Sequence, residues 1–120
     1  MRKVNYKGRC TKRKLTKCAE VCRTFDEIQT KGAEMFQAAD EIVEFRCNVC
    51  LEGIENNLYM SDLVAKKTDG TMMVRECVWR KNISKPLTAH LLDISRNYWL
   101  AHGVEDWGIV IEKVGPDEKE

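Results

Sequence analysis

The sequence predicts one domain of mixed α/β (α+β) class, in which helices and strands alternate along the chain. Two observations carry this prediction: apolar residues recur at helical spacing before residue 40 and after residue 84, and period-two patterns lie between these stretches. A third is the β-branched run at residues 109–111, which is typical of a short buried strand. The chain has 120 residues and 43% hydrophobic content, which is enough for the core of one domain.

The first predicted element is a basic amphipathic helix between residues 10 and 25. Its apolar positions are Leu15, Cys18, Val21, Cys22 and Phe25. Residues 1–24 contain nine Lys or Arg against the single acid Glu20, although the net charge of the chain is only +1. This segment is therefore a candidate nucleic-acid contact, and a solvated basic arm is the alternative. The candidate phosphate-binding residues are Lys12, Arg13, Lys14 and Lys17.

A second helix is expected to begin near residues 24–26, where Thr24 followed by Glu27 resembles a capping box. Its apolar stripe consists of Ile28, Met35, Phe36 and Ala39. A period-two strand follows at residues 42–51, with one face made of Val43, Phe45, Cys47, Val49 and Leu51. Residues 52–57 then form a turn into the next strand.

The last third of the chain predicts a long helix and a final strand. Ser84 is a candidate cap, Pro86 suits a first helical turn, and Gly103 ends the helix. The expected apolar stripe is Leu87, Leu91, Ile94 and Tyr98. A short strand at residues 107–112 and a polar tail at residues 114–120 complete the chain.

Residues 57–81 look like two strands joined by an Asp-Gly turn, with Asp62 in the first and Glu76 in the second. A two-residue turn would send these acids to opposite faces of the sheet. A three-residue loop closed by Gly70 would place them opposite each other, with Cβ atoms ~5 Å apart. Carboxylates at that distance repel unless one is protonated or a divalent cation lies between them. Two solvated strand carboxylates are the alternative interpretation.

The six cysteines are expected to remain thiols, because the chain begins without a signal-peptide pattern. Cys47 and Cys50 form a CxxC, but strand alternation would direct them to opposite faces, so zinc is unlikely as a cofactor and most cysteines should be small buried hydrophobes. No apolar run reaches the ~18 residues of a membrane span. We therefore expect a cytoplasmic protein without a membrane partner.

The predicted order of helix, three strands, helix and strand, with acids in the second and third strands, resembles the PD-(D/E)XK nuclease core. The stretches LLDISRNYWLAHGVEDWGIVIEK and EIVEFRCNVCL are similar to the TnsA endonuclease family, and the similarity covers about residues 25–112. The resemblance implies a restriction-endonuclease-like core at residues 25–113. In such a core a mixed four-stranded sheet is flanked by helices in the order αβββαβ, here preceded by the basic helix of residues 1–24.

The resemblance also implies site residues. Asp62 and Glu76 match the metal-binding positions, and Gln29 falls where the family's first helix contributes a glutamate. Val78 stands where the family has its catalytic lysine. Arg80 and Lys85 are the cations that would replace that lysine. The implied cofactor is Mg²⁺ or Mn²⁺, which would bind the scissile phosphate and activate water.

Two functional hypotheses follow. The first is a TnsA-like, metal-dependent endonuclease of a transposon or phage that cuts duplex DNA with a partner protein, and a homodimer would suit that role. The second is a catalytically inactive nuclease fold that binds DNA or protein in the host nucleic-acid-handling machinery, for example as an anti-defence inhibitor. Val78 and Gln29 favour the second. A small zinc-stapled interaction domain ranks third.

Overall fold

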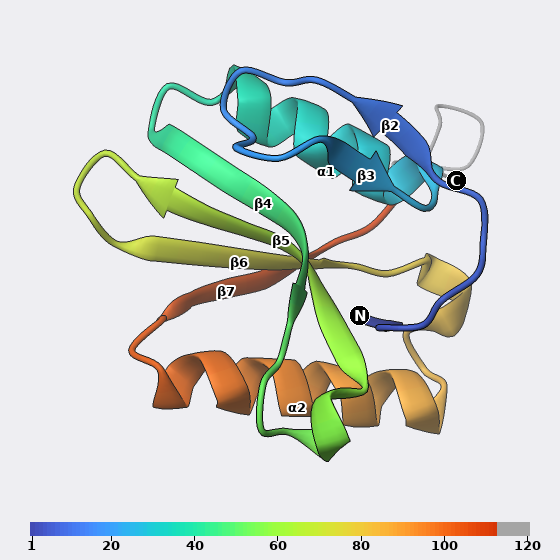
Figure 1. Cartoon of the computed structure of the whole chain (residues 1–120). Coiled ribbons are helices and arrows are strands. Elements are labelled where there is room, and N and C mark those ends of the chain that lie inside the picture. The colour runs from blue at the N-terminus through green and yellow to red at the C-terminus, as the bar shows by residue number, and fades with distance from the viewer. Residues whose placement is uncertain (113–120) are drawn as a thin grey trace, which may run out of the picture.

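The computed structural model describes residues 1–112, so the predicted polar tail at residues 114–120 lies outside the described residues. In chain order the elements are β1 (Arg2–Lys3), β2 (Thr11–Arg13), β3 (Cys22–Thr24), α1 (Glu27–Ala38), β4 (Ile42–Cys50), the 3₁₀ turn η1 (Glu55–Asn57), β5 (Tyr59–Lys67), β6 (Met72–Cys77), the 3₁₀ turn η2 (Arg80–Asn82), α2 (Pro86–Ala101) and β7 (Asp106–Val110). Figure 1 shows α1 on one face of a central sheet and α2 on the other. The predicted mixed α+β class is therefore confirmed.

The central sheet contains both antiparallel and parallel pairs. β4 and β6 flank β5 and run antiparallel to it, whereas β7 pairs with β6 in the parallel direction. The two-residue β1 pairs with β5 at Tyr59 and Met60, beyond the end of the β5–β6 ladder. Since β4 already covers one edge of β5 as far as Met60, β1 lies on the edge that β6 has left.

The two faces of the sheet support separate cores because side chains alternate along each strand. Leu63 and Ala65 of β5 pack in the cluster that includes Phe36 of α1. Val64 packs in the other cluster, with Val74 of β6 and Trp99 of α2. Near the start of β5 this alternation is interrupted, since Ser61 accepts from Trp99 Nε1 of α2 while Leu63 packs on the α1 side.

The β5–β6 connection is the three-residue loop that the acid pair requires. The Lys67 N–H donates to the Thr71 carbonyl at 2.8 Å, and the Gly70 N–H donates to the Lys67 carbonyl at 3.0 Å. Gly70 has φ of 87°, a left-handed conformation that glycine adopts without a Cβ penalty. The expected positive φ and odd loop length are thus confirmed.

The basic helix predicted between residues 10 and 25 is wrong. This segment forms a hairpin of β2 and β3, in which Arg13 pairs with Cys22. Cys22 and Thr24 are buried while Arg23 between them is exposed, which is the period of a strand. Val21 of the predicted stripe is 39% exposed, whereas Leu15, Cys18 and Cys22 reach the core without forming a helix. The pairing of β2 with β3 and the bridge between Cys18 and Phe45 of β4 form in place of the helix that the local spacing predicts.

The first long strand also differs from its predicted pattern in two places. The β4–β5 register shifts between Ile42 and Glu44, so Val43 forms a bulge and is 52% exposed. Ile42 takes the buried position instead. The predicted single face from Phe45 onward is wrong, because Phe45 and Cys47 pack in the cluster on the α1 side while Val49 and Leu51 pack in the other cluster. Asn48, between them, has a positive φ of 59°, which interrupts the strand alternation.

The helices occupy the predicted regions, with different caps and a partly different buried face. Asp26, not Thr24, caps α1 by accepting from the Gln29 N–H. In α2, Leu87 is 62% exposed and the buried side chains are Ser95 and Trp99. Ile94 and Tyr98 of the predicted stripe do pack against the core, so only the first turn of the stripe, at Leu87, faces away from it. Within residues 1–112, neither helix has the length and apolar character needed to cross a membrane.

Candidate functional site

Asp62 and Glu76 lie where β6 stops pairing with β5. The ladder ends at Leu63 and Arg75, so the two acids occupy the next opposing positions. The Asp62 N–H donates to Glu76 Oε1, and the Cys77 N–H donates to Asp62 Oδ2, both at 2.8 Å. The exposed fractions of Asp62 and Glu76 are 1% and 0%. At this fork the two carboxylates replace the ladder hydrogen bonds that would otherwise join the strands.

Helix α2 contributes a hydroxyl that orients Glu76. Ser95 Oγ donates to Glu76 Oε2 at 2.5 Å and accepts from Trp107 Nε1 of β7 at 2.9 Å. Because an indole N–H can only donate, the serine hydrogen is directed at the carboxylate. Ser95 is fully buried, so these two hydrogen bonds lie between α2 and the sheet, away from solvent.

The N-terminal strand brings two positive groups to the same fork. The Met1 ammonium lies 3.2 Å from Asp62 Oδ2 and 3.5 Å from Glu76 Oε1. Arg2 Nε lies 3.7 Å from Asp62 Oδ1, and the Arg2 guanidinium also pairs with Asp26. Figure 1 places the N-terminus between the sheet and α2. Two buried negative charges are therefore matched by two positive charges from β1.

The pKa shifts reflect this arrangement. Burial raises the pKa of Glu76, and the charge of Asp62 adds to the shift, while the Met1 ammonium and the serine hydroxyls oppose it. Burial alone would lower the pKa of the Met1 amine, but Asp62 and Glu76 outweigh it and raise the pKa above its ordinary value. The Met1 ammonium and the serine hydroxyls therefore stabilise the charged form of the buried Glu76 carboxylate.

The site residues fit a hard divalent cation by ligand type, because carboxylate oxygens are preferred by Mg²⁺ and Mn²⁺. Among the described residues, Asp62 Oδ1 is a buried oxygen without a hydrogen-bond partner. A cavity of about 150 Å³ adjoins the fork and is lined in part by Met1, Arg2, Cys77 and Val78. The Met1 ammonium holds the position between the carboxylates where a bridging cation would lie.

Gln29 does not face this position as expected. Its side-chain oxygen accepts from the Phe25 N–H at 2.9 Å, and its nitrogen donates to the Asp62 backbone carbonyl at 3.1 Å and to Asn48 Oδ1 at 2.9 Å. The reason is that α1 covers the face opposite the acid pair. Gln29 thus supports the backbone of Asp62 from behind, and its expected place beside the carboxylates is wrong.

The expected replacement cations also lie elsewhere. Arg80 is engaged with Glu112, to which it donates from its backbone N–H at 2.7 Å and from Nε at 3.2 Å. Lys85 is exposed at the start of α2. Val78 is 6% exposed. Within residues 1–112, the positive groups paired with the acids are Met1 and Arg2, which sequence reasoning missed because their proximity depends on β1 joining β5.

The four basic residues singled out in the N-terminal segment divide into two kinds. Arg13 pairs with Glu34 of α1 at 3.1 Å, and Lys17 Nζ donates to the Ala39 carbonyl at 2.6 Å, at the end of that helix. Lys12 and Lys14 are exposed. Arg13 and Lys17 therefore fix the hairpin to α1, which leaves Lys12 and Lys14 facing solvent.

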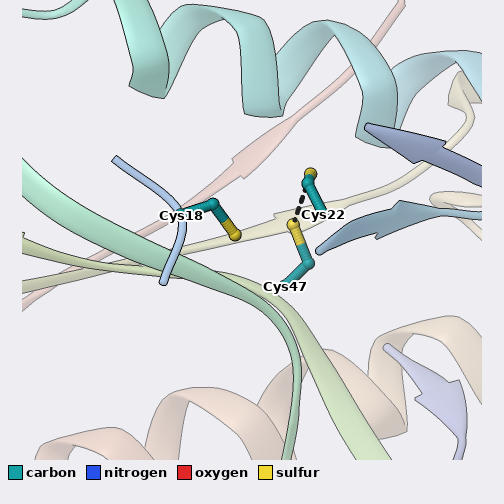
Figure 2. A group of neighbouring side chains, drawn as sticks. All are labelled: Cys18, Cys22 and Cys47. Carbon is teal, nitrogen blue, oxygen red and sulfur yellow. Dashed lines mark hydrogen bonds between the residues drawn. The ribbon is translucent and has the colours of Figure 1, made fainter. Parts of the chain in front are cut away.

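A separate thiol group lies on the α1 side of the sheet. The sulfurs of Cys18, Cys22 and Cys47 lie within 4.8 Å of one another, and Figure 2 shows them pointing together. Cys22 and Cys47 are 3.3 Å apart. Hydrogen bonding from Cys47 lowers the pKa of Cys22 to about 7, and the pKa of Cys47 is raised in turn. Cys50 lies apart, near the Asn57 carbonyl, so Cys47 and Cys50 do not converge on a common site.

The fork between β5 and β6 thus combines buried carboxylates with cations from the N-terminal strand, and it is the strongest candidate site in the described part of the chain. Its carboxylate oxygens are of the ligand type that hard cations prefer. No family model matches this chain, and a search of curated proteins finds no match either.

Proposed function

We propose that the chain is a metal-dependent DNA endonuclease of the TnsA-like, PD-(D/E)XK type. The observation that supports this proposal is the convergence of Asp62 and Glu76 on one cationic group at a fork in the sheet. Aspartate and glutamate are rarely buried so completely unless they are paired or bind a cation. The run of elements from α1 to β7, a helix, three antiparallel strands, a helix and a parallel strand, suits a restriction-endonuclease-like core.

In this proposal Asp62 and Glu76 hold Mg²⁺ or Mn²⁺. When bound, such an ion binds the scissile phosphate and lowers the pKa of the attacking water. Ser95 keeps Glu76 oriented, and the Cys77 N–H keeps Asp62 oriented. The Met1 ammonium would give up its contacts with both carboxylates for these residues to hold the ion. Arg2 then remains the nearest cation to Asp62 and is suited to bind a phosphate oxygen.

The test combines metal binding with cleavage. Mn²⁺ is titrated calorimetrically into wild type, Asp62→Asn and Glu76→Gln, and nicking of supercoiled plasmid is followed with Mg²⁺ or Mn²⁺. We expect each variant to bind Mn²⁺ at least about 100-fold more weakly, because it loses a ligand and not only an outer partner. Nicking should disappear with it. Asp93→Asn, which changes an exposed acid of α2, is the matched control and should resemble wild type.

Equal Mn²⁺ affinity in wild type and Asp62→Asn would remove the metal site, and the nuclease proposal with it. Nucleases of the TnsA type act with a partner protein, so the isolated chain can fail to cut DNA even if the proposal is right. Metal binding is therefore the primary measurement. If wild type and Asp62→Asn nick the plasmid equally well, the nicking comes from a contaminant.

The alternative is a nuclease fold without cleavage that binds duplex DNA or a protein of the host nucleic-acid-handling machinery, as an anti-defence inhibitor would. The buried Val78 in place of a lysine favours it. In this case wild type binds Mn²⁺ but does not nick DNA. Nicking that appears in Val78→Lys but not in the uncharged Val78→Met would assign the natural chain to this alternative.

A further inference from the structure

We propose that Cys18, Cys22 and Cys47 form a zinc-binding site that ties the β2–β3 hairpin to the central sheet. The proposal is independent of the nuclease proposal, because the thiols lie on the α1 side of the sheet and the acids on the α2 side. It reverses the ranking in the sequence analysis, where zinc was judged on the Cys47–Cys50 pair and Cys18 and Cys22 were assigned to a helix. Neither arrangement exists in the folded chain.

The distances between the sulfurs suit a zinc ion. Tetrahedral Zn²⁺ with Zn–S bonds of ~2.3 Å places its thiolates about 3.8 Å apart. The three sulfurs lie within 4.8 Å of one another, and the shortest separation, between Cys22 and Cys47, is 3.3 Å. Shifts of about 1 Å or less would bring all three to a common ion. A disulfide between Cys22 and Cys47 would use two of the thiols and leave Cys18 beside them without a role.

The fold positions the three thiols without help from a metal. Cys18 forms a bridge with Phe45 of β4, and the Phe45 N–H donates to the Lys17 carbonyl at 2.9 Å. Past Cys22, the Asn48 side chain donates to the Arg23 carbonyl at 2.8 Å. Backbone contacts on both sides of the cluster therefore hold the hairpin against β4. A site organised in this way loses little conformational entropy when an ion binds.

Charge and access also favour a divalent ion with one open position. Three thiolates and Zn²⁺ carry a net charge of −1, and Arg13 lies opposite Cys22 in the β2–β3 register. Cys18 and Glu20 line a cavity of about 390 Å³ that reaches the cluster from one side. A water molecule that enters through this cavity is therefore available as the fourth ligand. Binding releases the thiol protons to solvent, at most three per zinc.

The functional consequence is control of the basic hairpin. The hairpin carries the exposed Lys12, and its loop carries Lys14. Zinc at the cluster would fix both side chains relative to the sheet, whereas the metal-free hairpin depends on the short β2–β3 ladder and its contacts with α1 and β4.

The experiment is reconstitution of reduced protein with Zn²⁺ and, separately, Co²⁺. We expect one zinc per chain by elemental analysis and, with Co²⁺, an intense sulfur-to-metal charge-transfer band with the visible bands of tetrahedral cobalt. Cys47→Ser should weaken Zn²⁺ binding at least about 100-fold, measured against a chromogenic chelator. Cys50→Ser is the matched control, because Cys50 lies on the same strand and is also partly buried, and it should bind as wild type does.

A second measurement keeps the proposal testable if Cys47→Ser does not fold. Thiols of wild type are alkylated with and without Zn²⁺ and identified by mass spectrometry. We expect Zn²⁺ to protect Cys18, Cys22 and Cys47 and to leave Cys10 and Cys50 reactive. Less than about 0.2 zinc per chain after reconstitution, or protection of Cys50 in place of Cys47, overturns the proposal. A Cys22–Cys47 disulfide that survives reducing conditions also overturns it.

Discussion

At the scale of single residues, the acid pair shows how buried charge is tolerated in this protein. Asp62 and Glu76 are almost completely removed from water, and each accepts hydrogen bonds from backbone or hydroxyl donors. The Met1 ammonium contacts both carboxylates, and its amine has a raised pKa for that reason. Removing either kind of charge would leave the other buried and unpaired, which costs several kcal/mol in comparable sites, about 3–5.

The raised pKa of the Met1 amine predicts a loss of stability at alkaline pH. An amine whose pKa rises on folding stabilises the folded state fully below its unfolded pKa, and this contribution disappears as the pH rises through the folded value. We therefore expect the free energy of unfolding in urea to fall as the pH rises above about 8. The raised pKa of Glu76 acts in the same direction at lower pH, since its ionisation in the folded state is disfavoured.

The matched comparison for the pH experiment is the double variant Asp62→Asn/Glu76→Gln. Lysines titrate in both proteins, so the difference between the two curves reports the groups whose pKa the two carboxylates raise, the Met1 amine and the Cys77 thiol. Its alkaline loss of stability should be clearly smaller than that of wild type. Parallel curves would show that the Met1 amine does not depend on these carboxylates.

At the scale of secondary-structure elements, the contact of α1 with β5 depends on a glycine. Gly32 lies inside α1, where it lowers helix propensity. A Cβ at this position would lie 2.5 Å from Leu63 Cδ1, and Leu63 is completely buried. Helix propensity and packing therefore make opposite predictions for an alanine here, and the overlap decides between them.

Gly32→Ala should destabilise the protein by roughly 1–3 kcal/mol, because overpacking against Leu63 exceeds the propensity gain of about 1 kcal/mol. Urea unfolding monitored by circular dichroism measures the change. In a Leu63→Ala background the overlap is removed, so Gly32→Ala should become neutral or stabilising. The same destabilisation in both backgrounds would contradict a steric origin.

At the scale of the whole molecule, the N-terminal segment serves two purposes. Its first residues complete the sheet and supply cations to the acid pair. The following β2–β3 hairpin packs against α1 and β4, and it uses Arg13 and Lys17 for that packing. Only part of the basic charge of residues 1–24 is therefore free to bind a polyanion.

If the hairpin contacts duplex DNA, Lys12 and Lys14 carry the salt dependence. Each phosphate contact releases condensed counterions, so Lys12→Ala and Lys14→Ala should each reduce the slope of log affinity against log salt by about one unit. Arg13→Ala and Lys17→Ala should chiefly lower stability, because these side chains bind Glu34 and the Ala39 carbonyl. Fluorescence anisotropy with a labelled duplex from low to moderate salt provides the slopes. Unchanged slopes in the Lys12 and Lys14 variants would exclude these two contacts.

The sequence by itself determined the features that depend on neighbouring residues. Strand alternation, an Asp-Gly turn and the even separation of Asp62 and Glu76 were sufficient to predict the hairpin and to show that the acids oppose each other only across a three-residue loop, which the structure has. Pro86 and Gly103 were likewise sufficient to bound α2. These signals are local, because backbone sterics and side-chain period act within a few residues.

Tertiary structure decided everything that required distant segments to meet. Helical spacing in residues 10–25 was overridden because the segment could pair with itself and with β4. The cations at the acid pair come from β1, about sixty positions away from Asp62, since Met1 and Asp62 differ by 61. The thiols of Cys22 and Cys47, 25 positions apart in the sequence, meet because the β2–β3 hairpin packs against β4. No local pattern records such contacts, because their free energy comes from burying surface that only the assembled sheet and helices provide.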